Sequence, residues 1–145
     1  MNPNAALKQY GQVSAHGGVM DASPHRLIQM LMEGAITRVL SARGHMERGK
    51  TADKGSQISM AISIIDGLRL SLDRERGGEI ATNLEGLYEY MGRRLLEANL
   101  NNDLVILDEV LGILREIKGA WDQIDAAEAA APPVTAEPSP VASGN

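Results

Sequence analysis

Apolar residues recur along this chain at intervals of three and four positions, in four blocks separated by short polar or glycine-containing segments. This interval places side chains on one face of an α-helix, whereas a half-buried strand alternates every second residue. Helices joined by short connections become antiparallel neighbours, so the pattern predicts an all-α protein, an antiparallel up-down four-helix bundle with a short N-terminal arm. The four core stripes comprise Ile28, Met32, Ala35, Val39, Ala42 and Met46; Ile58, Ala61, Ile65, Leu68 and Leu72; Ile80, Leu84, Leu87, Tyr88, Met91, Leu95 and Ala98; and Leu104, Leu107, Leu111, Leu114, Trp121 and Ile124.

Local signals predict where these helices begin and end. Ser23 is a suitable N-cap, and Pro24 fits the first helical position, where its missing N–H costs nothing. Gly49 suits the left-handed position after the first helix. The pair Gly77-Gly78 predicts the break after the second helix, and residues 99–102 supply the turn before the fourth.

Composition divides the chain into three parts. Residues 1–22 mix small and polar residues with isolated apolar ones such as Leu7 and Tyr10, which is typical of a mobile arm. Residues 23–125 hold the bundle, and residues 126–145 are rich in alanine, proline and glutamate, which predicts a disordered tail.

The blocks contain more apolar positions than one core-facing stripe requires. In the first helix the extra residues widen the apolar arc to about 220°, against the roughly 100° that packing on one core needs. One interpretation is that these flanks simply widen the core; the other is that they line open grooves for a partner helix. The same surface is compatible with a homodimer. The flanking residues are Leu27, Leu31, Ile36, Leu40, Met60, Ile64, Ile106, Val110, Ile113 and Ile117.

Charge and composition narrow the functional classes. A formal net charge of −5 and an aromatic content of only 3% disfavour nucleic-acid binding, which needs clustered cations and stacking platforms. The chain contains no cysteine, so disulfides and thiolate metal sites are excluded. Neither a signal-peptide pattern nor an apolar run of about 20 residues is present, which predicts a soluble cytoplasmic protein.

A series of short motifs occurs in order between about Tyr10 and Trp121: Tyr10-Gly11-Gln12-Val13, Ala22-Ser23-Pro24, Leu31-Met32-Glu33-Gly34-Ala35, Ser71-Leu72-Asp73, Gly77-Gly78-Glu79, Asn83-Leu84-Glu85-Gly86-Leu87-Tyr88-Glu89-Tyr90-Met91 and Arg93-Arg94-Leu95-Leu96-Glu97-Ala98-Asn99. In content and order they resemble the FliS family of flagellar secretion chaperones. The resemblance covers everything except the two ends of the chain.

The resemblance implies a function without catalysis. A chaperone of this family binds the disordered C-terminal region of flagellin, prevents premature polymerisation in the cytoplasm, and delivers flagellin to the type III flagellar export apparatus. Tyr90 and Arg94 lie within the resembling motifs and are expected at the partner surface. For Arg94 a purely structural surface pair is an equal alternative to a contact with flagellin. Leu7 and Tyr10 are expected to compete with flagellin for a groove. The full expected partner-binding set is Leu7, Tyr10, Leu27, Leu31, Ile36, Leu40, Ile64, Tyr90, Arg94, Ile106, Val110, Ile113 and Ile117.

Two other functions fit parts of the sequence. The segment His45-Met46-Glu47-Arg48-Gly49 is similar to the phosphate-accepting histidine motif of phosphotransfer bundles, and a generic helical adaptor with another partner would show the same apolar flanks. No metal or cofactor is expected, because the histidines lack ligand spacing. His25 is expected at the surface, and Trp121 is expected to close one end of the bundle.

Overall fold

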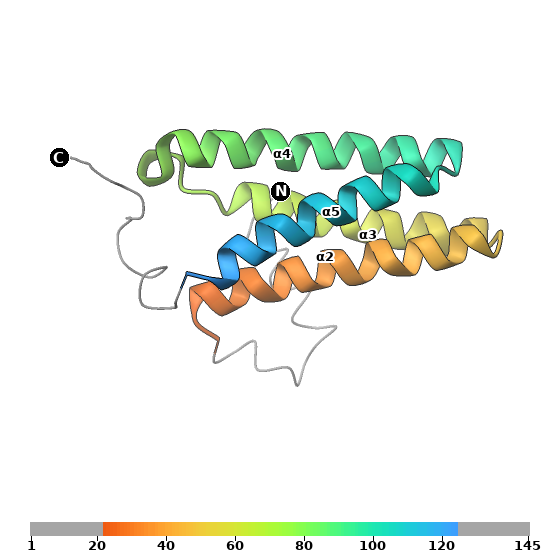
Figure 1. Ribbon diagram of the computed structural model, residues 1–145, viewed down its shortest axis with the longest axis horizontal. Helices are drawn as coiled ribbons and strands as arrows, with labels where there is room; N and C mark the ends of the chain where they lie inside the picture. The colour runs from red at the N-terminus through yellow and green to blue at the C-terminus, as the bar shows by residue number, and fades with distance from the viewer. Residues whose placement is uncertain (1–21, 125–145) are drawn as a thin grey trace.

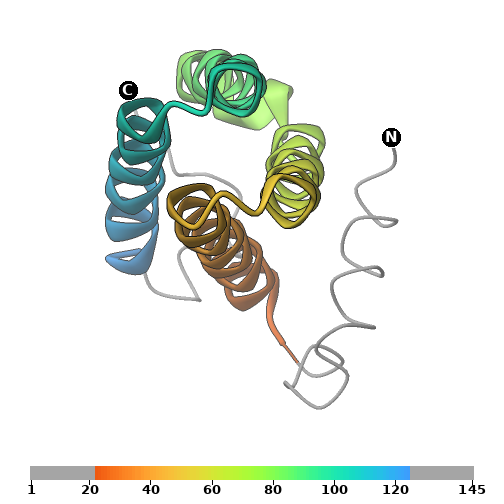
Figure 2. The same ribbon diagram turned by 90° about the vertical axis from the view of Figure 1, so that its right-hand side faces the viewer.

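The computed structural model describes residues 22–124. Within this part of the chain, helices α2 (Pro24–Glu47), α3 (Thr51–Leu70), α4 (Arg74–Asn101) and α5 (Leu104–Asp122) follow one another. Each helix packs against the next, and α5 packs back against α2, so the helices form a closed antiparallel ring (Figures 1 and 2). The predicted four-helix bundle is confirmed. The predicted arm and tail, with Leu7 and Tyr10, lie outside the described residues.

Most helix ends follow from local capping. The Ser23 hydroxyl accepts the Arg26 backbone N–H at 3.1 Å, as its N-cap position predicts. Gly49, just beyond α2, has a φ of 70°, the left-handed conformation predicted for it. The turn before α5 places Asn102 at a φ of 51°, and the Asp103 carboxylate accepts the backbone N–H groups of Val105 and Ile106.

The predicted break at Gly77-Gly78 is wrong in its position. Helix α3 ends earlier, at Leu70, and α4 already begins at Arg74, because the Asp73 carboxylate caps the Arg76 backbone N–H at 3.1 Å. The glycine pair produces a kink inside α4 instead of a loop, since Gly78 has φ 52° and ψ −125°.

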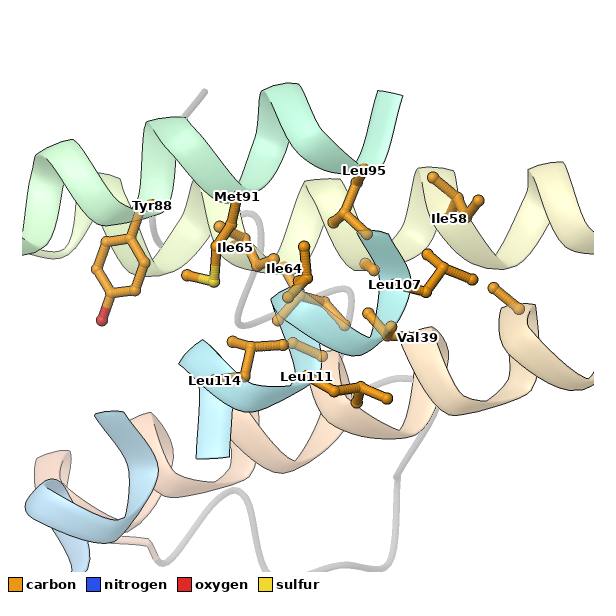
Figure 3. Packing of buried hydrophobic residues seen from close by; sticks show 14 of the residues in the cluster. Val39, Ile58, Ile64, Ile65, Tyr88, Met91, Leu95, Leu107, Leu111 and Leu114 are labelled. Atoms are coloured by element: carbon orange, nitrogen blue, oxygen red, sulfur yellow. The ribbon is translucent and has the colours of Figure 1, made fainter. Parts of the chain in front are cut away.

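The core lies along the axis of the ring and draws residues from all four helices (Figure 3). Four residues predicted to lie on open flanks, Leu31, Ile64, Ile106 and Val110, are buried in this core, so their predicted exposure is wrong. The reason is geometric: a helix in a closed ring borders two neighbours, and it therefore buries a wider arc than contact with one partner would. For these four positions the widened-core interpretation holds.

A reciprocal contact joins the first turn of α2 to the last turn of α5. The rings of His25 and Trp121 stack with centroids 5.1 Å apart. The Trp121 Nε1–H donates to the His25 carbonyl at 3.0 Å, and His25 Nε2 lies 3.0 Å from the Trp121 carbonyl, which can only accept. The expected surface position of His25 is therefore wrong: the residue is buried. Trp121 packs against the core at this end, as predicted.

At the opposite end of the bundle, a buried lysine joins the start of α3 to the end of α4. Lys54, in the first turn of α3, donates from Nζ to the Asn99 carbonyl at 2.9 Å and to Asn102 Oδ1 at 2.5 Å. Its positive charge thus lies at the C-terminal end of α4, where unpaired carbonyls carry partial negative charge.

The core predicts how two leucines respond to the same truncation. Leu107→Ala should lower the free energy of unfolding by about 2–5 kcal/mol, because Leu107 is fully buried and the change leaves a cavity. Leu100→Ala should change it by no more than about 0.5 kcal/mol, because Leu100 is 82% exposed. Urea unfolding followed by circular dichroism measures both. Equal losses would contradict the assigned core.

Candidate partner-binding surface

The large apolar side chains that stay well exposed in the described part of the chain gather mainly on α4. This helix carries four of them, whereas α2 and α5 carry one each. They are Leu40, Ile80, Leu87, Leu96, Leu100 and Val105. Removing such side chains from water lowers the free energy of the system. The surface around α4 is therefore where a binding partner would find the most apolar area.

Contacts between α4 and α5 identify the sides that these helices turn to each other. Arg94 and Glu109 form an ion pair across the two helices, with Nε and Oε1 2.8 Å apart. Leu87 lies seven residues before Arg94, and Ile113 lies four residues after Glu109, so each shares a helix face with its paired residue. Four apolar residues, Ile80, Leu87, Ile113 and Ile117, therefore line the border between the helices, here termed the α4–α5 strip.

The strip stays accessible because α5 runs diagonally across the bundle. Figure 1 shows α5 starting beside the end of α4 and finishing beside the start of α2. Ile106 and Val110, near the start of α5, are buried, whereas Ile113 and Ile117, further along, remain half-buried. Leu87 is 38% and Ile80 60% exposed. The predicted core positions of Leu87 and Ile80 are therefore wrong, because α5 leaves α4 before reaching them.

A polar brace marks the point where the two helices separate. Glu109 uses both carboxylate oxygens: Tyr90 Oη donates to Oε2 at 2.5 Å, and Arg94 Nε donates to Oε1 at 2.8 Å. Arg94 also donates from Nη1 to Glu97 at 2.7 Å, and its guanidinium carbon lies 6.0 Å from the centre of the Tyr90 ring. We term Tyr90, Arg94 and Glu109 the brace.

The structure thus brings Tyr90 and Arg94 together, two residues expected at the partner surface. Sequence reasoning missed Glu109. Its signal was present, because Glu109 interrupts a flank of α5 that otherwise reads Ile106, Val110 and Ile113. An acidic residue on an apolar flank requires a polar partner, but only the fold supplies the identity of that partner.

The brace shifts the protonation equilibria of its members. The hydrogen bond from Tyr90, followed by that from Arg94, lowers the pKa of the Glu109 carboxyl below its ordinary value. The hydrogen bond to Glu109, together with partial desolvation, raises the pKa of the Tyr90 hydroxyl. At neutral pH Glu109 is therefore ionised and Tyr90 protonated, which are the states that these hydrogen bonds require.

The flank residues predicted on α2 are only partly accessible. Leu27 and Ile36 are half-buried, and Leu40 is 44% exposed. Ile36 lies seven residues before Arg43, which pairs with Asp108 of α5 at 2.7 Å. Ile36 and Leu40 consequently lie on the border between α2 and α5, separate from the α4–α5 strip.

His45 of the phosphotransfer-like motif, and the acidic residues Asp73 and Glu85, are engaged in structural contacts. Arg48 lies 3.3 Å from His45 Nδ1 in the last turn of α2, Asp73 caps α4, and Glu85 pairs with Arg74. Among residues 22–124, no group of three or more histidine, aspartate or glutamate side chains is placed to hold a metal ion. No described helix has the length and apolarity needed to cross a membrane.

The fold and the strip define a helical-bundle protein with an uncovered apolar border and a polar brace beside it. Comparison with known proteins identifies its family: the model described as "Flagellar protein FliS" matches residues 6–128, and the chain belongs to the FliS family. The chain is 57% identical to flagellar secretion chaperone FliSB of Pseudomonas aeruginosa over 119 residues, covering 82% of this chain and 94% of that protein.

Two further relatives carry the same description. Identity is 53% to flagellar secretion chaperone FliS of Salmonella typhimurium over 121 residues, covering 83% of this chain and 90% of the relative. It is 31% to the Bacillus subtilis FliS over 122 residues, covering 84% and 85%. The predicted family is therefore confirmed, and the chain is placed among flagellar secretion chaperones.

The brace predicts a pH-dependent contribution to stability. Because the pKa of Glu109 is lower in the folded protein than in the unfolded chain, the contribution is present above the ordinary value of 4.5 and is lost as pH falls through the folded pKa. At pH 7, Glu109→Gln should lower the free energy of unfolding by at most about 1 kcal/mol, since the brace is partly exposed. Urea unfolding of both proteins at pH 7 and at low pH measures this difference. A difference that stays constant down to low pH would contradict the assignment.

Proposed function

We propose that this protein binds the disordered C-terminal region of flagellin on the α4–α5 strip, keeps it from polymerising in the cytoplasm, and delivers it to the flagellar export apparatus. The observation that carries the proposal is the strip itself, which stays accessible because α5 diverges from α4. Membership of the FliS family supports the identity of the partner. No bond is made or broken in this function, so the protein acts without catalysis.

The mode of binding follows from the shape of the apolar surface. Ile113 and Ile117 are one helical turn apart on α5, and Ile80 and Leu87 are two turns apart on α4, so the strip is long and narrow. An amphipathic helix can lay its apolar face along such a surface. Flagellin would then gain helical structure on binding, and part of the apolar gain would offset the loss of chain entropy. Several moderate contacts of this kind allow release.

The proposed contact set differs from the set expected from sequence. Leu31, Ile64, Ile106 and Val110 lie in the core, and a partner could reach them only if the bundle opened. On the α4–α5 strip the proposal therefore retains Ile113 and Ile117 as apolar contacts and adds Ile80 and Leu87. Leu27, Ile36 and Leu40 are retained as a second contact area on α2, separate from the strip. Tyr90 and Arg94 remain, as the polar group at the end of the strip.

Two leucines on opposite sides of α4 test the proposed surface. Leu87→Ala should weaken flagellin binding by about tenfold, corresponding to about 1.4 kcal/mol, because it removes a contact from the strip. Leu96→Ala is the matched control, since Leu96 is exposed on the same helix but lies about two and a half turns beyond Leu87, on the opposite side. Titration calorimetry with full-length flagellin and with flagellin lacking its C-terminal region measures both variants.

Two results would contradict the surface or the partner. Equal weakening by Leu87→Ala and Leu96→Ala would show that the strip has no special role. Undiminished binding of the flagellin that lacks its C-terminal region would show that another part of flagellin is recognised.

The N-terminal arm supplies a separate prediction. If Leu7 and Tyr10 occupy the partner surface in the absence of flagellin, a chain without its first twenty residues should bind flagellin with a higher association rate, because a competitor has been removed. Stopped-flow measurements compare this chain with the full-length protein and with Tyr10→Ala. Unchanged affinity and association rate in both would count against competition by the arm.

A further inference from the structure

The two ends of the α4–α5 strip differ in shape. At one end the brace joins α4 to α5, and Arg94 Nε lies 2.8 Å from Glu109 Oε1. Toward Ile80 the two helices diverge, as Figure 1 shows, and we term this the open end of the strip. A partner helix that lies along the strip therefore points one of its own ends at the brace and the other at the open end.

Carboxylates without cationic partners flank the strip toward its open end. Residues 77–92 of α4 include three glutamates and neither lysine nor arginine. Glu79 is exposed and forms no ion pair within the described part of the chain. The same holds for Glu116, which lies seven residues after Glu109 and therefore shares its face of α5. Both arginines in the first turn of α4 are already paired with other carboxylates. The charge beside the open end is therefore negative.

The brace end presents hydrogen-bond donors instead. Arg94 uses Nε for Glu109 and Nη1 for Glu97. Its remaining nitrogen, Nη2, carries two N–H groups and has no hydrogen-bond partner among the described residues. Arg93 is exposed, forms no ion pair with a described residue, and holds its guanidinium carbon 6.0 Å from the centre of the Tyr90 ring. Donors and an unpaired positive charge thus meet at the brace.

A bound helix would respond to this difference because its own ends carry opposite partial charges. The first turn of a helix has unpaired N–H groups and is partially positive, and the last turn has unpaired carbonyls and is partially negative. Helices α4 and α5 are antiparallel, so their own dipoles oppose each other beside the strip and select no direction. The side-chain charges therefore select it.

We propose that the flagellin helix on the strip runs parallel to α4, with its N-terminus at the open end and its C-terminus at the brace. This inference rests on the proposed function. Arg94 Nη2 and the Arg93 guanidinium donate to the last carbonyls of the bound helix, whereas Glu79 and Glu116 face its first N–H groups. The brace then has two roles: it ties α4 to α5, and it caps the partner.

Distances between spin labels report the direction of the bound helix. The chain has no cysteine, so Thr82→Cys or Leu100→Cys gives a single label. These exposed positions are five turns, or about 27 Å, apart on the side of α4 that faces away from the strip. The second label is attached to a single cysteine moved in seven-residue steps through the C-terminal region of flagellin. Along the segment nearest α4, pulsed electron paramagnetic resonance should show a shortening distance to Leu100→Cys and a lengthening distance to Thr82→Cys, by up to about 10 Å per step toward the flagellin C-terminus.

Charge-removing variants test the cause of this direction. At low ionic strength, Arg93→Gln and Glu79→Gln should each weaken flagellin binding by about two- to fivefold, because each removes a charge that favours one end of the bound helix. Arg115→Gln and Glu89→Gln are the matched controls. They remove the same charges from exposed residues that form no ion pair with a described residue, on the sides of α5 and α4 that face away from the strip. Titration calorimetry should show less than a twofold change for both controls.

The outcomes separate the direction from the function on which it rests. A reversed or absent distance trend would overturn the direction while leaving flagellin binding intact. Tighter binding by both Arg93→Gln and Glu79→Gln would overturn it as well, because that result is expected when the helix dipole points the other way. Equal weakening by the variants and their controls would contradict recognition of the helix ends. A wild-type protein that does not bind flagellin would overturn the proposed function and the direction together.

Discussion

The path of α5 is the constraint on which the accessible surface of this bundle depends. Near its start the brace ties α5 to α4 through Glu109, and at its last turn the contact between His25 and Trp121 ties it to α2. A straight helix held at both points must cross the bundle diagonally. It therefore seals the core near Ile106 and leaves Ile113 half-buried further along.

Apolar burial and polar contacts have different roles in this arrangement. The fully buried residues of the core supply most of the stabilisation, since each buried leucine or isoleucine contributes about 1.5–3 kcal/mol. The partly exposed ion pairs contribute far less to stability. Their geometry nevertheless decides where helices meet: Glu109 determines where α4 and α5 separate, and Glu85 determines where the first turn of α4 lies. The buried core thus stabilises the bundle, and the weaker polar contacts orient the helices so that a surface for a long apolar partner stays accessible.

How much of the site could be predicted depended on the range of the interactions involved. Helix periodicity and the caps at Ser23 and Gly49 act over a few residues, so the sequence alone predicted them correctly. Asp73 also acts locally, but the glycine pair that follows it is the stronger break signal, so the sequence pattern predicts the break too late. The motifs from Tyr10 onward likewise sufficed for the family, because they depend on residue identity and order.

The sequence by itself therefore determined the helices, the bundle class and the family, since local periodicity, capping chemistry and motif order carry that information. Only the tertiary structure decided which apolar flanks stay accessible. Val110 and Ile113 both lie on a flank of the same predicted helix, yet one is buried and the other is not. The difference arises from the angle at which α5 crosses its neighbours, and that angle depends on contacts between residues far apart in the chain, such as those of His25 with Trp121 and of Arg94 with Glu109.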